Sequence, residues 1–302
     1  MTRLAIALAL SGALGLTTLV VARQGAPSVD LVEVDVVVVD GKDQPITRLQ
    51  RDDFTVKEDG RIVDVKTFSE RLPSDPRDPD DVRSVAILMD DAGVPPTGNE
   101  TMKTIARAFV ASAAPRDEIS IVRLHNYDDE PFGDRRLAES RIAAYRANSA
   151  AFTDWGTPGE TLDRMAGIAR LMEGDDHRRK VIVCVGAPAV CNIAEPPKVA
   201  LRALWPRWVR VLTSTAKANV SIYAIVPGRA TLRGGGLSDY TGGEVFATTY
   251  DLGPAIDRIL RDANHHYMLG YWPDGKSREL HSIDVKVARH GARVHARRRR
   301  GD

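Results

Sequence analysis

The sequence has almost no excess of charge of either sign. It holds 42 lysines and arginines against 41 aspartates and glutamates, for a formal net charge of +1. A chain without a global positive field has no general attraction to nucleic acid or acidic lipid, so neither is expected as a partner on charge grounds. The one local basic run, residues 297–300, is expected to be a solvated end segment, with a basic anchor as the alternative.

Recognisable catalytic motifs are also scarce. The order of residues supports no Ser-His-Asp or Cys-His arrangement, and the glycine-rich stretch 233–243 lacks the strand, loop and helix context of a phosphate-binding loop. His265 and His266 have no acidic or cysteine partner at ligand spacing, so an interface or surface role is favoured over metal binding. The sequence is therefore interpreted as that of a non-enzyme.

Cysteine is nearly absent, with only Cys184 and Cys191 in 302 residues. An even number suits a disulfide in an oxidising compartment. The alternative is one buried thiol and one loop thiol, since Cys184 lies inside an apolar run where a thiol is usually inert. The residues leave both interpretations open.

The beginning of the chain has the pattern of an export segment. Arg3 precedes an apolar stretch over 4–21, and small residues follow it. We interpret residues 1–26 as a signal peptide. The alternative is an uncleaved membrane anchor, which is the only way in which a membrane becomes a partner. The folded part is expected to be periplasmic, secreted or anchored outside the cytoplasm.

Residues 27–70 and 275–302 are expected to form one small antiparallel β domain built from both termini. The first segment is rich in valine and has Asp-Gly pairs at 40–41 and 59–60, which are strong signals for two-residue hairpins. It has too few strands to bury a core alone, and the alternating pattern over 281–287 supplies another. A linker rich in proline and aspartate, 71–83, separates the first segment from the middle of the chain.

Between these ends, residues 84–274 alternate short apolar runs with amphipathic patterns. The expected strands are 85–89, 119–124, 181–185, 221–226 and 267–272. The expected helices cover 102–113, 162–172, 201–212 with a bend at Pro206, and 256–263; Trp205 and Trp208 are expected in the core. This order predicts an α/β fold with a doubly wound, mostly parallel sheet. Ligands bind such sheets beyond the carboxyl ends of the strands, where Asp90 and Asp91 follow the first strand.

The segment "VVVVDGKDQPITRLQRDDFTVKEDGRIVDVKTFSE" resembles the amino-terminal signature of exported bacterial proteins related to the von Willebrand factor type A domain, described mainly from acidobacteria. Asp53-Phe54 and the Glu-Asp-Gly at 58–60 are its most specific part. The last segment, 265–302, also resembles that family's ending. The resemblance covers nearly the whole mature chain.

This resemblance implies a metal-ion-dependent adhesion site. The family pattern uses D-x-S-x-S after the first strand, a threonine on a second loop and an aspartate after a later strand, as ligands for Mg²⁺ or Mn²⁺. Here Asp90 matches the first position, but Ala92 and Val94 replace both serines and Gly186 stands where the later acid is expected. The site is therefore expected to be degenerate.

The candidate metal ligands are Asp90, Asp91 as an unusual second carboxylate, and Thr157, with Thr161 as its alternate. The other interpretation is that the aspartates approach a helix amino terminus and face solvent. Two functions remain open. The favoured one is a non-catalytic, exported binding or adhesion module that recognises a protein partner at the carboxyl edge of the sheet. The alternative is a divalent-metal hydrolase that uses both aspartates and the acids of 125–130.

Overall fold

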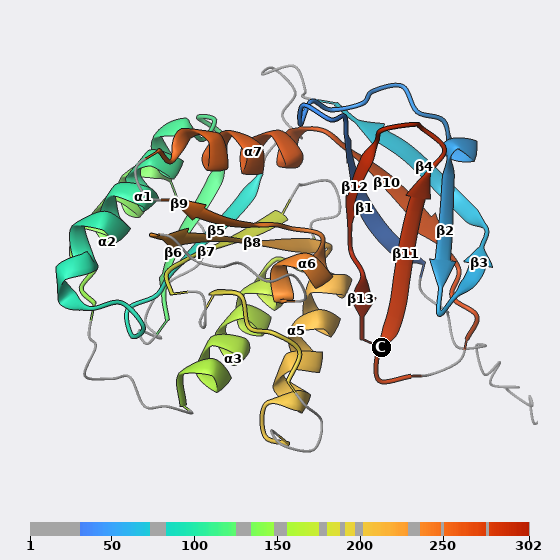
Figure 1. Cartoon of the computed structure of the whole chain (residues 1–302). Coiled ribbons are helices and arrows are strands. Elements are labelled where there is room, and N and C mark those ends of the chain that lie inside the picture. The colour runs from blue at the N-terminus through green and yellow to red at the C-terminus, as the bar shows by residue number, and fades with distance from the viewer. Residues whose placement is uncertain are drawn as a thin grey trace, which may run out of the picture.

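The structure is a computed structural model, and it describes residues 31–72, 83–124, 134–147, 156–174, 180–187, 191–196, 202–228, 236–248, 251–275 and 278–301. The expected signal segment and most of the linker lie outside these residues. Among the described residues, no helix has the length and apolarity that a membrane crossing needs. The fold is mixed α/β, with a five-stranded parallel sheet and two antiparallel sheets (Figure 1).

The parallel sheet has the strand order β6-β5-β7-β8-β9. Its strands are β5 (Ser84–Met89), β6 (Glu118–Arg123), β7 (Lys180–Val185), β8 (Val220–Pro227) and β9 (Val245–Thr248). β5 and β7 are buried along their whole length. Near-continuous apolar runs of this kind form strands that are covered on both faces, as the sequence predicts.

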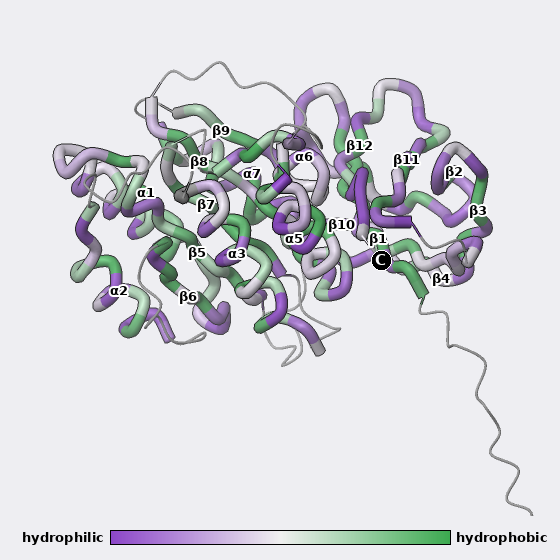
Figure 2. Tube along the Cα trace, turned by 90° about the horizontal axis from the view of Figure 1, so that it is seen from below, coloured by the Kyte–Doolittle hydropathy of each residue, from purple (hydrophilic) through white to green (hydrophobic). Residues whose placement is uncertain are grey.

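Helices cover both faces of this sheet. Alternate side chains of β5 point to opposite faces, so Ile87 belongs to one core and Leu88 to the other. The Ile87 core includes α1 (Asn99–Ser112), α2 (Arg135–Ala144) and α7 (Gly253–Asn264). The Leu88 core includes α3 (Gly156–Leu171), α5 (Trp205–Lys217) and α6 (Leu237–Thr241). In Figure 2 the hydrophobic residues gather along the strands, whereas hydrophobic and hydrophilic residues alternate along the helices.

The prediction of a helix bent at Pro206 is wrong. α5 begins at Trp205, so Pro206 lies in its first turn, where a missing backbone N–H costs no helical hydrogen bond. The predicted stripe of apolar side chains is present along α5. Trp205 and Trp208 are buried and stacked, with ring centroids 5.9 Å apart, as expected of core residues.

The two antiparallel sheets pack together beside the parallel sheet and form a β sandwich. The first has the order β12-β1-β10-β4 and the second β13-β11-β2-β3. Their strands are β1 (Val32–Val39), β2 (Phe54–Glu58), β3 (Arg61–Val63), β4 (Val65–Arg71), β10 (His266–Tyr271), β11 (His281–Val287), β12 (Arg293–Ala296) and β13 (Arg299–Arg300). A short 3₁₀ turn, η1 (Arg51–Asp53), precedes β2, and η2 (Pro96–Gly98) precedes α1.

The sandwich corrects one assignment. The segment 267–272, expected in the parallel sheet, lies in β10, which pairs antiparallel with β1 and β4. Strands from both ends of the sequence thus meet in this sheet, since β1 pairs with β10 on one side and with β12 on the other. Its Tyr267, Leu269 and Tyr271 are buried in the same core as Val34 and Val36 of β1. An apolar run of six residues cannot by itself say which sheet it joins.

One of the two Asp-Gly predictions holds. Asp59 and Gly60 have φ of 50° and 79°, and they form the tight turn between β2 and β3. Asp40 instead opens a wider loop, because its Oδ1 accepts hydrogen bonds from the backbone N–H groups of Lys42 (2.8 Å) and Gln44 (2.9 Å). A side chain that binds its own loop competes with the two-residue hairpin.

The basic run 297–300 is only partly the solvated segment expected from the sequence, because Arg298 is exposed whereas Arg297 and Arg300 are buried. Arg297 is buried and donates to the carbonyl oxygens of Thr215 and Val220, both at 2.9 Å. Arg300 donates to Oε1 of Glu58 at 2.8 Å inside the sandwich. Arg297 thus joins the sandwich to α5 and β8, whereas Arg300 pairs with Glu58 of β2 within the sandwich.

Candidate functional site

The candidate site lies at the topological switch point of the parallel sheet. The chain passes from β5 to β6 on one side, and β7 then pairs with β5 on the other. The crevice between the carboxyl ends of β5 and β7 is where ligands bind in open α/β sheets. Asp90 follows β5 directly, and Gly186 follows β7 directly.

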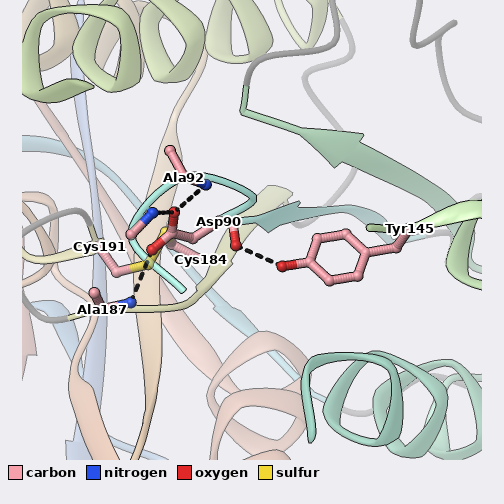
Figure 3. Close-up of a disulfide and its surroundings, with 7 residues drawn as sticks. Asp90, Ala92, Tyr145, Cys184, Ala187 and Cys191 are labelled. Atoms are coloured by element: carbon pink, nitrogen blue, oxygen red, sulfur yellow. Dashed lines mark hydrogen bonds between the residues drawn. A yellow bond between two sulfur atoms is a disulfide. The ribbon is translucent and has the colours of Figure 1, made fainter. Parts of the chain in front are cut away.

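The Asp90 carboxylate spans this crevice (Figure 3). Its Oδ1 accepts hydrogen bonds from the backbone N–H groups of Ala92 (3.0 Å) and Gly93 (2.6 Å), while Oδ2 accepts one from the N–H of Ala187 at 3.0 Å. Ala92 and Gly93 belong to the loop after β5, and Ala187 belongs to the loop after β7. The side chain is fully buried. One carboxylate therefore ties both loops together.

The electrostatics agree with a structural role for this group. Burial raises the pKa of the Asp90 carboxyl above its ordinary value, whereas the three N–H donors oppose that shift. Tyr145, which ends α2, donates its hydroxyl to the carbonyl oxygen of Asp90 at 2.6 Å. Burial, and then the charges of Asp90 and Asp91, raises the pKa of this phenol too. Tyr145 thus stays protonated and serves as a donor.

Gly186 allows the carboxylate to lie where it does. A Cβ atom at this position would overlap the Cβ of Asp90 and would lie 2.7 Å from its Oδ2. Any side chain at 186 would force the Asp90 side chain out of its set of N–H donors. The glycine at the place where the family pattern expects an acid is therefore required by Asp90.

A disulfide anchors the second loop. Cys184, inside β7, is bonded to Cys191, and both residues are fully buried. The bond closes the loop that carries Gly186 and the Ala187 amide, next to Asp90 (Figure 3). Of the two alternatives left open by the sequence, the structure has the disulfide.

The residues described do not fit an adhesion-type metal centre. Both oxygens of Asp90 already accept N–H bonds, and Ala92 and Val94 offer no side-chain oxygen. Asp91 is buried beside it. Thr157 is described only as part of the first turn of α3, and the alternate Thr161 is fully buried. Within the described ranges, no three His, Cys, Asp or Glu side chains are grouped for a metal ion.

The remaining sequence candidates lie elsewhere. The acids of 125–130 fall outside the described residues. His265 and His266 lie at the start of β10, in the sandwich, where Nε2 of His265 is 3.0 Å from Oε1 of Glu70 and Nε2 of His266 is 3.8 Å from Oδ1 of Asp35. Both histidines are buried inside the fold, so the expected surface role is wrong for them.

The sequence reasoning missed two partners of Asp90, namely the Ala187 amide and Tyr145. A backbone donor leaves no residue-type signal, and Tyr145 follows a weakly amphipathic segment. The residue type at 186 was the one signal available in the sequence. A glycine where the family pattern expects a metal ligand indicates that another group lies too close for a side chain, and here that group is the Asp90 side chain.

Comparisons with known proteins identify no family. No family model matches the sequence, and no curated protein sequence matches it either. Among solved structures, the TFIIH p34 N-terminal domain has 12% identity and a TM-score of 0.37, over 60% of this chain and 97% of that one. The D319A mutant of the PilB minor pilin from Streptococcus sanguinis has 10% identity and a TM-score of 0.38, over 60% of this chain and 62% of that one. Both likenesses are too distant to carry an argument.

Proposed function

We propose that this chain is an exported, non-catalytic binding module that recognises a protein partner at the carboxyl edge of its parallel sheet. In this proposal the unit around that sheet is a doubly wound domain of the von Willebrand factor type A kind, with a degenerate adhesion site. One observation carries the proposal: the Asp90 carboxylate is fully buried and accepts three backbone N–H bonds from two loops.

This arrangement favours recognition over catalysis. A carboxylate whose oxygens are already bonded is poorly placed to bind a metal or to activate water. It does hold the two loops of the switch point in one conformation, and a preorganised surface loses less conformational entropy when a partner binds. Directly beyond the fixed loop, Pro95, Pro96 and Thr97 are exposed and offer a surface to a partner.

A site-specific photocrosslinker tests the location of the partner. It replaces Thr97 at the carboxyl edge or, as the matched control, Lys217, which is exposed at the end of α5 near the amino edge of β8. We expect Thr97 to capture a discrete protein that Lys217 does not, and the purified partner to bind the wild-type chain. Identical capture from both positions, or a purified partner that does not bind, contradicts the proposal.

Metal titration separates this function from the hydrolase alternative. Calorimetry with Mg²⁺ and Mn²⁺ compares the wild-type chain with the Asp90→Ala, Asp91→Ala double variant, after circular dichroism has shown that the variant is folded. We expect no saturable heat that depends on the two aspartates. Saturable binding that the folded variant loses would favour the hydrolase, because metal-assisted hydrolysis needs convergent ligands and an open coordination position.

A further inference from the structure

The sandwich has an open edge on the side away from the parallel sheet (Figure 1). The strand orders place β4 at the end of the first antiparallel sheet and β3 at the end of the second. β3 has only three residues, whereas β4 has seven and contains no proline. Among the described residues, β4 pairs with β10 alone. A strand of this length with one unpaired side is a template for another strand.

The hydrogen bonds of β1 show how the backbone groups of β10 are directed. The carbonyl of Val38 accepts from the N–H of Ile46, so Val38 turns its backbone groups away from β12. By alternation Val36 does the same, toward β10, where it pairs with Tyr267. The next residue of β10, Met268, therefore turns its backbone groups to the other side, toward β4.

The alternation continues in β4. Met268 pairs with Ser69, so the backbone groups of Ser69 point inward, to β10. Those of its two neighbours, Phe68 and Glu70, therefore point outward at the free edge. The pairing with β10 uses neither the N–H nor the C=O of these two residues. They can form hydrogen bonds with a further strand.

The sequence of β4 is complementary to itself when it is read in the opposite direction. If a second copy pairs antiparallel, with Phe68 opposite Phe68, then Thr67 lies opposite Ser69 and Lys66 lies opposite Glu70. Aromatic pairs, hydroxyl pairs and pairs of opposite charge are the cross-strand pairs that stabilise antiparallel sheets. This register also lets the outward N–H of each Phe68 donate to the carbonyl of the other.

The side chains that this register pairs can be reached from outside. Lys66 is exposed, and its ion pair with the exposed Asp64 contributes little to hold it in place. The Glu70 side chain is bonded through Oε1 to the N–H of Arg48, yet it remains 19% exposed. Phe68 is half-buried at the margin of the sandwich core. All three can therefore contact a second copy.

Large apolar side chains are exposed around the same edge. Of the four that are exposed among the described residues, three are Ile62, Leu72 and Trp272. Ile62 lies in β3, Leu72 directly follows β4, and Trp272 directly follows β10, the neighbour of β4. Exposed apolar side chains that gather on one side of a protein mark an interaction surface.

We propose that β4 forms the interface of a symmetric dimer, in which two copies of this chain join their first antiparallel sheets edge to edge. The result is one continuous sheet with four strands from each copy. The twofold axis passes between the two Phe68 residues, and each Lys66 pairs with Glu70 of the second copy. A twofold interface uses the same surface on both copies, which a self-complementary strand satisfies. This inference concerns the sandwich and does not rest on the carboxyl-edge function.

Sedimentation velocity of the mature chain, without residues 1–26, over a series of concentrations tests the dimer. We expect a reversible dimer with a dissociation constant on the order of 10 μM, since an edge-to-edge interface is smaller than that of a permanent dimer. Lys66→Glu should weaken the dimer about tenfold or more, because both Lys–Glu pairs become pairs of like charge. The control Lys286→Glu, at an exposed position of β11 in the same sandwich, should leave it unchanged. A chain that stays monomeric up to about 1 mM overturns the proposal, as does a dimer that Lys66→Glu leaves unchanged.

Hydrogen exchange locates the interface. Raising the concentration from about 1 μM to about 500 μM should slow exchange of the Phe68 and Glu70 amides about fivefold or more, because exchange there requires the monomer. The amides of Thr67 and Ser69 point to β10 and should exchange at the same rate at both concentrations. If the chain dimerises while the Phe68 and Glu70 amides exchange as before, the interface lies elsewhere and the proposal is wrong.

Discussion

Gly186 and Asp90 lie in direct contact across the switch point, where a Cβ on Gly186 would come within 2.9 Å of Cγ of Asp90. The two residues are far apart in sequence, yet each restricts which side chain can stand at the other position. The aspartate occupies the volume of a side chain at 186, and the glycine lets the carboxylate reach the Ala187 amide at 3.0 Å.

The first prediction concerns that contact. Replacing Gly186→Ala should lower the free energy of unfolding by about 1 to 3 kcal/mol, because the added methyl group overpacks a buried site. The control is Gly41→Ala, where nothing lies within 4 Å of the added atom; we expect a change within about 0.5 kcal/mol. Urea denaturation measures both. Equal stabilities of the two variants would mean that the Asp90 loop yields to the methyl group.

The second prediction concerns the disulfide. Replacing both cysteines, Cys184→Ala and Cys191→Ala, should lower the free energy of unfolding by about 2.5 kcal/mol. This is the value that the loop-entropy relation gives for a seven-residue separation. The loop that carries Ala187 should also open more often, so exchange of the Ala187 amide should accelerate. Denaturant titration and hydrogen exchange test the two effects. A double variant as stable as the wild type would contradict this.

The third prediction separates a buried arginine from an exposed one. Arg297→Ala should cost about 2 to 4 kcal/mol, since it leaves the buried carbonyls of Thr215 and Val220 without their donor. Arg298→Ala should cost less than about 1 kcal/mol, because the ion pair of Arg298 with Asp239 is exposed. Thermal or chemical unfolding measures the free energy of unfolding of both variants. Similar losses for the two would mean that Arg297 is exposed to solvent in the same way as Arg298.

The fourth prediction concerns pH. His295 in β12 lies at the junction of the sandwich and α7. Burial, and then the positive charge of Arg258, lowers the pKa of His295 below its ordinary 6.5. The charged groups that act on it are Arg258, Asp262, Glu244 and Arg293. Above pH 6.5 the imidazole is neutral in both states; below it the unfolded chain takes up the proton first. Stability should therefore fall as the pH drops through and below 6.5.

His295→Gln removes this contribution. Unfolding free energies measured between about pH 7.5 and about pH 5 should then vary less with pH than in the wild type. His290→Gln is the control, because His290 is exposed in the turn before β12. Carboxylates whose pKa is lowered in the folded chain, such as Asp59 and Glu70, lose their contribution at more acidic pH, near and below 4.5. Identical pH profiles for all three proteins would contradict the assignment.

The sequence predicts the parallel sheet well because its strands are buried on both faces and consist of continuous apolar runs. β5 and β7 are found close to where the pattern places them. The prediction fails at β10, because the same apolar run suits either sheet, and the choice depends on partners at Val34 and Thr67 in other parts of the chain. Such pairings are long-range and have no local pattern.

At the site, the sequence predicts the place of Asp90 but not its chemistry. The sequence shows directly that Ala92 and Val94 replace both serines of the D-x-S-x-S pattern. The role that the carboxylate takes instead depends on the N–H groups of Ala92, Gly93 and Ala187, which every residue type except proline carries. For the same reason the charges at 297–300 suggested solvent, although Arg297 finds backbone carbonyls in α5 and at β8.

The register of β1 has a consequence for the order in which the protein forms. Val32 pairs with Tyr271 and Val36 with Ala296, so the first strand finds its neighbours only after nearly the whole chain has been made. At typical rates of synthesis that interval lasts roughly 10 to 50 s. The parallel sheet, whose strands end by Thr248, is complete earlier. The valine-rich β1 therefore lacks both of its native neighbours for that interval.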